Sequence, residues 1–288
     1  MRISIYWPGF IFLLFTGSNE LTWGQEEKTL SLNIMTYNIR YAADQPEVYS
    51  WKNRRDGIMQ SFEGTDIAGL QEVLNVQVED LKSSLSGYNL IYRSREAEAS
   101  VGEGVPILFK EDKFSLLYSG TFWLSDTPEL PGSNTWEAAC NRIVTWGRFL
   151  DKESNIEFFV FNTHLDHISQ YARENGTRLI LSTIQMMAPG FPVILMGDFN
   201  ADEENNVYKM ITEFGLKDTY RDIRHESDST DLTYHGWQNE SGLTRIDYVF
   251  VSTDFHVKNT KVVREKVNGI YPSDHFPVVS EIEITRPE

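Results

Sequence analysis

The chain has very little cysteine: Cys140 is the only one among 288 residues. A single thiol cannot close a disulfide within the chain, so a hydrophobic core has to hold the fold together. The hydrophobic share of 41% is that of a folded globular protein. We expect Cys140 to be a small buried apolar residue rather than a nucleophile.

Basic residues are also scarce. Lysine and arginine together number 26, against 42 aspartates and glutamates, which gives a formal net charge of −16. Proteins that grip long nucleic acids by charge alone neutralise phosphates with lysine and arginine, and this balance argues against that class. A small phosphorylated ligand, or one bridged by a metal ion, fits the composition better.

The N-terminus lacks an apolar run long enough to span a membrane. The apolar run there covers only Ile3–Phe15, between Arg2 and a polar stretch that ends at Thr22-Trp23-Gly24. A membrane-spanning helix needs about 20 apolar residues. A basic start, a short apolar run and small residues before the end are instead typical of a cleaved signal peptide. The pattern predicts a signal peptide over residues 1–24 and an exported protein, periplasmic or secreted, rather than a membrane anchor.

Linkers rich in proline, glycine or serine are absent, as are repeats of fixed period, which predicts one domain over residues 27–288. Several predicted strands follow one another without a helix between them, so hairpins and a mixed sheet are expected. The expected strands are Leu30–Ile39, Asp66–Gln71, Gly104–Phe109, Ile143–Leu150, Glu157–Asn162, Pro192–Met196, Arg245–Val251 and His275–Ile284. The expected helices are Ser50–Phe62, one capped by Asn75, and Ser169–Met187.

Hard oxygen donors follow several of these strands at the points where they end, namely Asn38, Glu72, Asp198, Asn200 and Asp274. Such ligands suit Mg²⁺, Mn²⁺ or Ca²⁺, whereas zinc sites favour histidine and cysteine. Taken alone, an aspartate or asparagine after a strand is more often a turn residue. A buried glutamate such as Glu72, however, has to be paired or metal-bound. Together these residues predict a hard-metal site.

Histidines accompany these carboxylates. His164 closes the run Phe158-Phe159-Val160-Phe161-Asn162-Thr163, and His275 follows Asp274 directly. A lone histidine is more often structural, but two at strand ends beside carboxylates suit general acid and base roles. The remaining histidines lack such a setting and are expected at the surface, namely His167, His225 and His256.

In this order, the strand ends resemble the motifs of the endonuclease/exonuclease/phosphatase superfamily, to which pancreatic deoxyribonuclease belongs. The resemblance covers nearly the whole chain after the signal peptide and implies a four-layer α/β/β/α sandwich of two packed mixed β-sheets flanked by helices. The motifs are Thr36-Tyr37-Asn38-Ile39, Leu70-Gln71-Glu72-Val73, Asn162-Thr163-His164-Leu165, Gly197-Asp198-Phe199-Asn200, Arg245-Ile246-Asp247-Tyr248 and Ser273-Asp274-His275-Phe276-Pro277.

The resemblance also implies roles for the site residues. Glu72 would be the principal ligand of Mg²⁺ (or Mn²⁺, with Ca²⁺ as a further option), and Asn38 and Asp274 would complete the metal site directly or through water. Asp247 would orient His275. The implied catalytic residues are His164, Asp198, Asn200, Asp247 and His275.

Three further residues resemble supporting positions of the family. Glu103 matches a glutamate that partners His164, although it fits a loop carboxylate in water equally well. Arg142 resembles an arginine that contacts phosphate, the alternative being a solvated arginine at the start of a strand. His235, in Thr233-Tyr234-His235-Gly236-Trp237, is a candidate for substrate binding, and packing beside Trp237 is the competing interpretation.

The implied activity is metal-dependent hydrolysis of a phosphate ester by in-line attack of water. A phosphodiesterase or phosphatase for small or lipid-linked phosphates, a secreted endo- or exonuclease, and a non-catalytic binding domain all stay open. A monomer without an obligate protein partner is expected. Specificity is expected to lie in the loops Glu111–Asn141 and Leu216–Gly242, and the tryptophans nearby fit either a substrate wall or the core, namely Trp123, Trp136 and Trp237.

Overall fold

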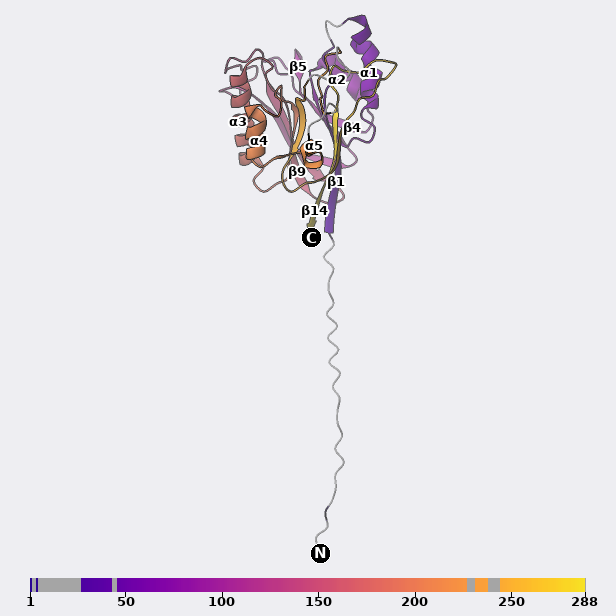
Figure 1. Ribbon diagram of the computed structural model, residues 1–288, viewed down its shortest axis with the longest axis vertical. Coiled ribbons are helices and arrows are strands. Elements are labelled where there is room, and N and C mark those ends of the chain that lie inside the picture. The colour runs from indigo at the N-terminus through magenta and orange to yellow at the C-terminus, as the bar shows by residue number, and fades with distance from the viewer. Residues whose placement is uncertain (2–3, 5–26, 43–45, 227–230, 238–243, 288) are drawn as a thin grey trace.

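A computed structural model describes residues 1, 4, 27–42, 46–226, 231–237 and 244–287 (Figure 1). The predicted signal peptide therefore lies almost entirely outside the described residues. Among the helices in the described part of the chain, none has the length and apolar character needed to cross a membrane.

Two six-stranded mixed sheets form the centre of the molecule. In sheet 1, β1 pairs in parallel with β2 and antiparallel with β14, and in sheet 2, β10 pairs in parallel with β9 and antiparallel with β12. Across sheet 1 the strands are β13 (His256–Val262), β14 (Val278–Pro287), β1 (Glu27–Asn38), β2 (Ile67–Gln71), β6 (Ile107–Lys110) and β4 (Tyr88–Ile91). Across sheet 2 they are β11 (Lys217–Asp218), β12 (Asp247–Val251), β10 (Val193–Asp198), β9 (Glu157–His164), β8 (Ile143–Asp151) and β7 (Phe114–Trp123).

Helices cover the outer faces of both sheets, α1 and α2 on one side and α3 and α4 on the other (Figure 1). The helices are α1 (Trp51–Gln60), α2 (Asn75–Ser84), α3 (Gln170–Met187), α4 (Asn206–Glu213) and the short α5 (Thr219–Ile223), with a 3₁₀ turn, η1, at Glu47–Tyr49. A two-stranded ribbon joins β3 (Val73–Leu74) and β5 (Glu103–Gly104). The predicted α/β/β/α sandwich is confirmed.

Three apolar layers follow from this arrangement. The central layer joins inward-facing residues of both sheets, such as Ile34 and Ile67 of sheet 1 with Val160 and Met196 of sheet 2. The other two lie beneath the helices. Since side chains of a strand alternate between its faces, strands covered on both sides become apolar throughout. That is why the central runs could be read from the sequence.

Several elements differ from the predicted ones. The run expected at Gly104–Phe109 divides into β5 and β6, because Pro106 lacks the N–H that a continuous ladder needs. Asn75 stands inside the first turn of α2, whose N-cap is Leu74. The segment expected as the loop Glu111–Asn141 contains β7, an edge strand with many exposed side chains and therefore no clear apolar alternation.

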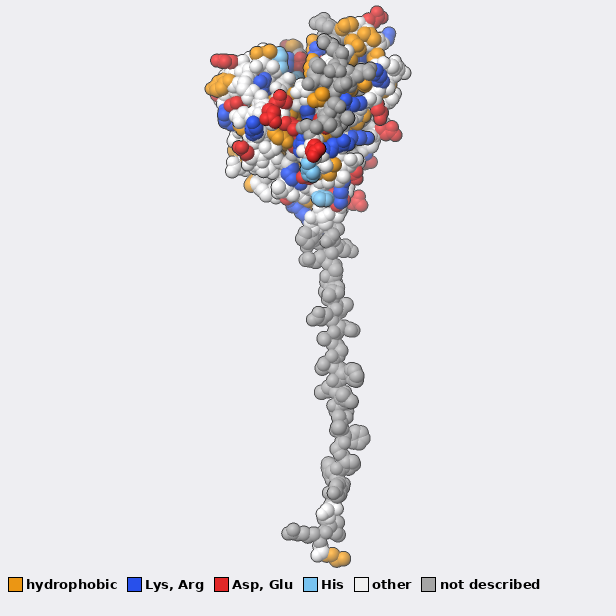
Figure 2. All heavy atoms as spheres, viewed as in Figure 1, with side chains coloured by type: hydrophobic (Ala, Val, Ile, Leu, Met, Phe, Trp, Pro, Cys, Tyr) orange, Lys and Arg blue, Asp and Glu red, His pale blue; other side chains and the backbone are white. Residues whose placement is uncertain are grey.

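The surface carries mixed charge. On the face that Figure 2 shows, lysine and arginine side chains are scattered among aspartates and glutamates and do not merge into one basic area. This distribution agrees with the excess of acidic residues in the composition.

Candidate active site

The predicted site residues meet at one edge of the sandwich. In sheet 2, Asp198 at the end of β10 stands in register with His164 of β9 on one side and Asp247 of β12 on the other. In sheet 1, Asn38 ends β1 beside the end of β2. A hydrogen bond of 3.0 Å from Asn38 Nδ2 to Asp198 Oδ2 joins the two sheets at this edge.

Two of these residues have left-handed backbones that turn their side chains into the site. Glu72, directly after β2, has φ 61°, and Asn200, after β10, has φ 47°. A non-glycine residue adopts this conformation at a cost, which the surrounding structure has to offset. Asn200 is held by its N–H, which donates to Asp198 Oδ1 at 3.0 Å, and by its Nδ2, which donates to Leu165 O at 3.0 Å.

Asp198 is buried and lies close to both histidines of the site. Its Oδ2 lies 3.3 Å from His164 Nε2 and 3.8 Å from His275 Nε2. Burial and the neighbouring Asp247 raise the pKa of Asp198 to about 7, against the opposing effect of His275. Burial, together with the charges of Arg142 and Arg95, holds the pKa of His164 well below its ordinary value. Asp198 thus has a carboxylate that can exchange a proton near neutrality, beside a neutral imidazole.

His275 and Asp247 form a buried pair. Asp247 Oδ2 lies 2.9 Å from His275 Nδ1, so the imidazole presents its Nε2 to the cavity. Burial opposes a charge on the ring, but the carboxylate of Asp247 and its hydrogen bond raise the pKa of His275 to about 10. The orientation of His275 by Asp247 agrees with the role that the sequence implied.

The candidate metal centre lies on the sheet 1 side. Glu72 and Asp274 are buried carboxylates that face the same guanidinium, that of Arg40, at 3.3 and 3.7 Å. Burial raises the pKa of Asp274, and His275 and Arg40 oppose the rise. Carboxylate oxygens are hard donors, and the acidic groups here exceed the cationic groups nearby, so the residues fit a divalent cation such as Mg²⁺ or Mn²⁺.

Asn38, expected to complete the metal site directly or through water, is hydrogen-bonded to the carboxylates around it. Its Nδ2 donates to Glu72 Oε1 at 3.1 Å as well as to Asp198, and its Oδ1 accepts from the N–H of Arg40 at 3.1 Å. The amide therefore spaces the two carboxylates, while its Oδ1 keeps a second lone pair beside the hydrogen bond from Arg40. The hydrogen bonds place Asn38 as a support for Glu72 and Asp198.

Arg142 lies beside His164 and is 6% exposed. Its Nη2 is 3.2 Å from His167 Nδ1, and its Nε is buried without a hydrogen-bond partner. Within the described ranges of the chain, no carboxylate lies at ion-pair distance from Arg142, and Glu103 and Asp166 act on it only over a longer distance. A buried guanidinium without a carboxylate in direct contact is costly, which leaves room for an anion to bind it directly.

An open cavity of about 660 Å³ lies over these residues. Its lining is strongly polar, and its few apolar members include Ala201 and Ile246. The polar and charged lining residues are Arg40, Tyr41, Glu72, Arg95, Glu103, Arg142, His164, His167, Asp198, Asn200, Asp202, Asn205, Tyr234, Thr244 and His275, with Cys140 beside them.

Comparison with known proteins agrees with this geometry. The sequence pattern of the Endonuclease/Exonuclease/phosphatase family matches residues 35–275. The chain belongs to that family. An endonuclease/exonuclease/phosphatase structure from Bacteroides vulgatus is 33% identical, covers 88% of this chain and 99% of its own, and superposes with a TM-score of 0.84. A mannosyl-6-phosphatase from Bacteroides thetaiotaomicron is also 33% identical, over 87% of this chain and 99% of its own, with a TM-score of 0.80.

A more distant curated relative is a probable RNA exonuclease from Schizosaccharomyces pombe, 24% identical over 83% of this chain. The chain spans only 47% of that protein's length. The family assignment therefore fixes the fold, and these relatives differ in the activity that their names give.

Two residues take positions other than those expected for this family member. Glu103 binds Arg95, with its carboxylate oxygens 2.8 and 3.2 Å from the two Nη atoms, and it makes no hydrogen bond with His164 within the described residues. The Arg95 side chain supplies the charge that Glu103 needs: burial raises the pKa of this carboxyl and Arg95 opposes the rise. Arg95 itself comes from a loop without a recognisable motif, so the sequence did not reveal it.

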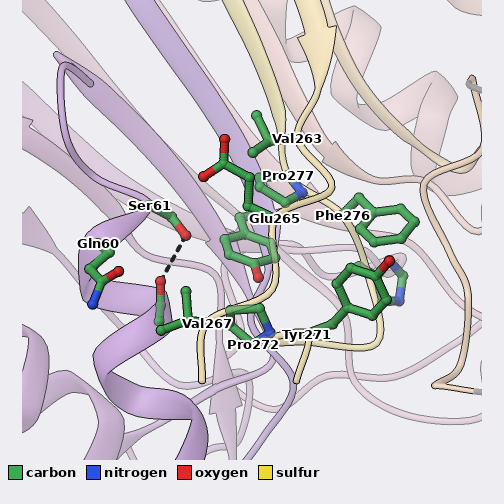
Figure 3. A pocket seen from close by; sticks show the side chains of 12 residues that line it. Gln60, Ser61, Val263, Glu265, Val267, Tyr271, Pro272, Phe276 and Pro277 are labelled. Atoms are coloured by element: carbon green, nitrogen blue, oxygen red, sulfur yellow. Dashed lines mark hydrogen bonds between the residues drawn. The ribbon is translucent and has the colours of Figure 1, made fainter. Parts of the chain in front are cut away.

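His235 lies beneath the site rather than in the cavity. It is buried, stacks on Phe276 at 4.2 Å and meets Tyr271 edge-on at 4.9 Å. Tyr271 and Phe276 also line a smaller cavity of about 70 Å³ (Figure 3). This position does not support substrate binding by His235, because its ring packs against Phe276 and Tyr271.

Other lining residues were missed or misjudged. His167 is exposed as predicted, yet it lines the cavity and contacts Arg142. Cys140 is only half-buried and also lines the cavity. The tryptophans belong to the packing and not to the cavity wall: Trp123 and Trp136 join core clusters, and Trp237 stacks on Tyr49 at 4.3 Å.

Proposed function

We propose that the protein is a divalent-metal-dependent hydrolase that removes phosphate from a small, hydrophilic phosphate ester. The observation that carries this proposal is Arg142, a buried guanidinium without a carboxylate partner in the described chain, at the wall of the cavity beside His164. A planar guanidinium binds phosphoryl oxygens through parallel hydrogen bonds. A phosphoryl group would supply the directly bonded anion that this guanidinium lacks within the described chain.

The lining of the cavity supports a polar leaving group. An acyl chain would need an apolar wall, and that lining has few apolar members, such as Ala201 and Ile246. Asp202, Asn205 and Thr244 can instead exchange hydrogen bonds with hydroxyl groups. The similarity to a mannosyl-6-phosphatase supports the same class of substrate, a sugar phosphate.

Glu72 and Asp274 would hold the divalent cation, Mg²⁺ or Mn²⁺, with Asn38 fixing the position of Glu72. A bound cation of this kind neutralises charge that develops on phosphoryl and leaving-group oxygens.

The side chains around the cavity bind the phosphoryl group and take up the proton of the attacking water. Arg142 binds and orients the phosphoryl group, and His275, oriented by Asp247, donates from Nε2 to a phosphoryl oxygen. Asp198 accepts a proton from the attacking water, whose oxygen forms a bond to phosphorus. The bond from phosphorus to the leaving oxygen breaks, and that oxygen takes its proton from water in the open cavity. Asn200 holds Asp198 through its backbone N–H.

The test is a substrate panel in Mg²⁺ and in Mn²⁺, containing sugar phosphates, phosphodiesters, RNA and DNA. We expect release of inorganic phosphate from sugar phosphates, abolished by a chelator and restored by either metal. The variant Glu72→Gln should lose the activity while keeping the wild-type melting temperature within a few degrees. Turnover that survives both the chelator and this substitution would remove the metal centre from the reaction.

A nuclease is the second candidate, because the chain resembles a probable RNA exonuclease. The net charge of −16 makes binding of a long polyanion unfavourable. The RNA arm of the panel separates the two: faster release of nucleotides than of phosphate from sugar phosphates would favour the nuclease.

We also propose export to the periplasm or the medium after removal of residues 1–24, which rests on the N-terminal sequence pattern. N-terminal sequencing of the protein recovered outside the cytoplasm tests it. A chain that still begins with Met1 would contradict cleavage.

A further inference from the structure

Arg40 stands inside the candidate metal centre. Its Nη1 lies 3.3 Å from Glu72 Oε2, and its Nε lies 3.7 Å from Asp274 Oδ2. These two carboxylates are the charged oxygen donors on this side of the site, and Asn38 faces Glu72 with its amide nitrogen. A fixed positive charge therefore shares the ligands that a divalent ion would use.

The fold holds Arg40 in this place through its main chain. The residue has a left-handed backbone, with φ 54°. Its N–H donates to Asn38 Oδ1 at 3.1 Å, and its carbonyl accepts from Gln77 Nε2 at 2.9 Å and from Arg54 Nη2 at 3.1 Å. Both of these donor side chains come from buried residues. A strained backbone persists only where several contacts determine it, so the position of Arg40 is built into the fold.

The guanidinium, in contrast, is held mainly by charge. It lies over the ring of Tyr41 at 4.5 Å from the ring centre, and its Nε is buried without a hydrogen-bond partner among the described residues. Among the residues that the structure describes, its one hydrogen bond with a carboxylate runs from Nη1 to Glu72 at 3.3 Å. The side chain is 28% exposed, which leaves it room to move while its backbone stays in place.

We propose that Arg40 is the resident counter-charge of the metal centre, which neutralises Glu72 and Asp274 without metal and competes with the divalent cation for them. The inference rests on the proposed function through the presence of a metal there. Two carboxylates brought together out of water repel each other, and a nearby cation relieves this repulsion. The same cation repels an incoming divalent ion. Arg40 thus stabilises the metal-free protein and weakens its metal affinity.

The test measures Mn²⁺ binding by electron paramagnetic resonance of the free ion, and thermal unfolding of the chelator-treated protein. For Arg40→Gln, we expect a lower melting temperature without metal and a dissociation constant for Mn²⁺ about tenfold lower than that of the wild type. For Arg40→Lys, which keeps the charge, the dissociation constant should stay within about twofold of the wild type. Substitution of a merely structural arginine would lower the melting temperature without raising the affinity for Mn²⁺.

Arg55→Gln is the matched control. It removes the same charge from α1, where the side chain is 43% exposed and lies near Asp56 and Asp80. Its Mn²⁺ affinity should equal that of the wild type. The proposal is overturned if Arg40→Gln binds Mn²⁺ no more tightly than the wild type. It is also overturned if Arg55→Gln or Arg40→Lys gains as much Mn²⁺ affinity as Arg40→Gln.

Neither measurement uses a substrate, so the two proposals fail separately. A wild type that hydrolyses nothing in the panel, with Arg40→Gln binding Mn²⁺ more tightly, would contradict the proposed function alone. A metal-dependent hydrolase in which Arg40→Gln leaves the Mn²⁺ affinity unchanged would contradict the role of Arg40 alone.

Discussion

At the scale of single residues, charge and burial oppose each other around Arg142. The guanidinium is 6% exposed and contacts His167, yet it forms no ion pair in the described part of the chain. A buried charge without a directly bonded partner costs desolvation free energy, and an apolar side chain of similar size in its place removes that cost. Arg142 therefore lowers stability in exchange for the ability to bind an anion.

For Arg142→Met we expect the free energy of unfolding to rise by about 1 kcal/mol. Inorganic phosphate should raise the melting temperature of the wild type and leave that of the variant unchanged. Differential scanning fluorimetry with and without phosphate measures both effects. Arg142→Lys, the control, should keep part of the phosphate response without the gain in stability. A destabilised Met variant that still responds to phosphate would contradict this role.

Asp247 offers a second test at this scale. Because Asp247 Oδ2 holds His275 Nδ1 at 2.9 Å, Asp247→Asn should misorient the imidazole and lower kcat by about 10²–10³-fold, as loss of a donor to a phosphoryl oxygen does. KM should change much less, because the charge that develops on this oxygen strengthens the hydrogen bond mainly in the transition state. Steady-state kinetics on the best substrate of the panel measures this split. The double variant with His275→Gln should be no slower than the slower single variant, and multiplied losses would show that the two residues act independently.

At the scale of elements, the close approach of β9 and β10 places Asp198. Gly197 has φ 152°, and a Cβ at this position would lie 2.1 Å from Thr163 O of the neighbouring strand. Only glycine allows this backbone and this contact. The residue type at Gly197 thus fixes the distance between His164 and Asp198.

Gly197→Ala should therefore destabilise the protein by about 3 kcal/mol and remove activity together with stability. Chemical denaturation and phosphate release measure the two losses. Gly190→Ala is the matched control, since its φ is 76° but nothing lies within 4 Å of the added Cβ. It should cost about 1 kcal/mol and leave kcat unchanged. Equal losses in both variants would assign the effect to backbone strain alone.

Many of the strands, and the site residues at their ends, could be predicted from the sequence. The central strands are covered on both faces, so their apolar runs and the polar residues that end them, such as Glu72 and Asp198, marked both the sheets and the site. The edge strand β7 could not be predicted, because its exposed side chains interrupt the run of apolar residues that marks a buried strand. The partners of Glu103 and Asn38 were also hidden, because Glu103 pairs with the side chain of Arg95 and Asn38 accepts from the main-chain N–H of Arg40, and both arginines lie in loops.

At the scale of the whole molecule, His235 links stability to pH. Burial and the charge of His275 lower the pKa of His235 from 6.5 to about 4 in the folded protein. Between these values the unfolded chain binds more protons, so this histidine lowers stability as the pH falls from about 6.5 to about 4. The stabilising state is the neutral ring stacked on Phe276.

His235→Phe keeps an aromatic ring for this stack and removes the titration. Its free energy of unfolding should fall less steeply with acid than that of the wild type, by on the order of 1 kcal/mol per pH unit between these limits. Urea denaturation at several pH values measures the slopes. His256→Phe, at an exposed position on β13, should follow the wild type. Parallel slopes for all three proteins would exclude His235 as the source.

The pairing of β1 with β14 has a consequence for how the molecule is made. The ladder runs from Glu27 opposite Pro287 to Thr36 opposite Val278, so β1 pairs with a strand that is synthesised much later. Until β14 emerges from the ribosome, β1 lacks one of its two neighbours in sheet 1. Sheet 1 is therefore completed only after β14 has been synthesised. A nascent chain that still lacks β14 remains open to chaperones, to proteases and to transport in an unfolded form.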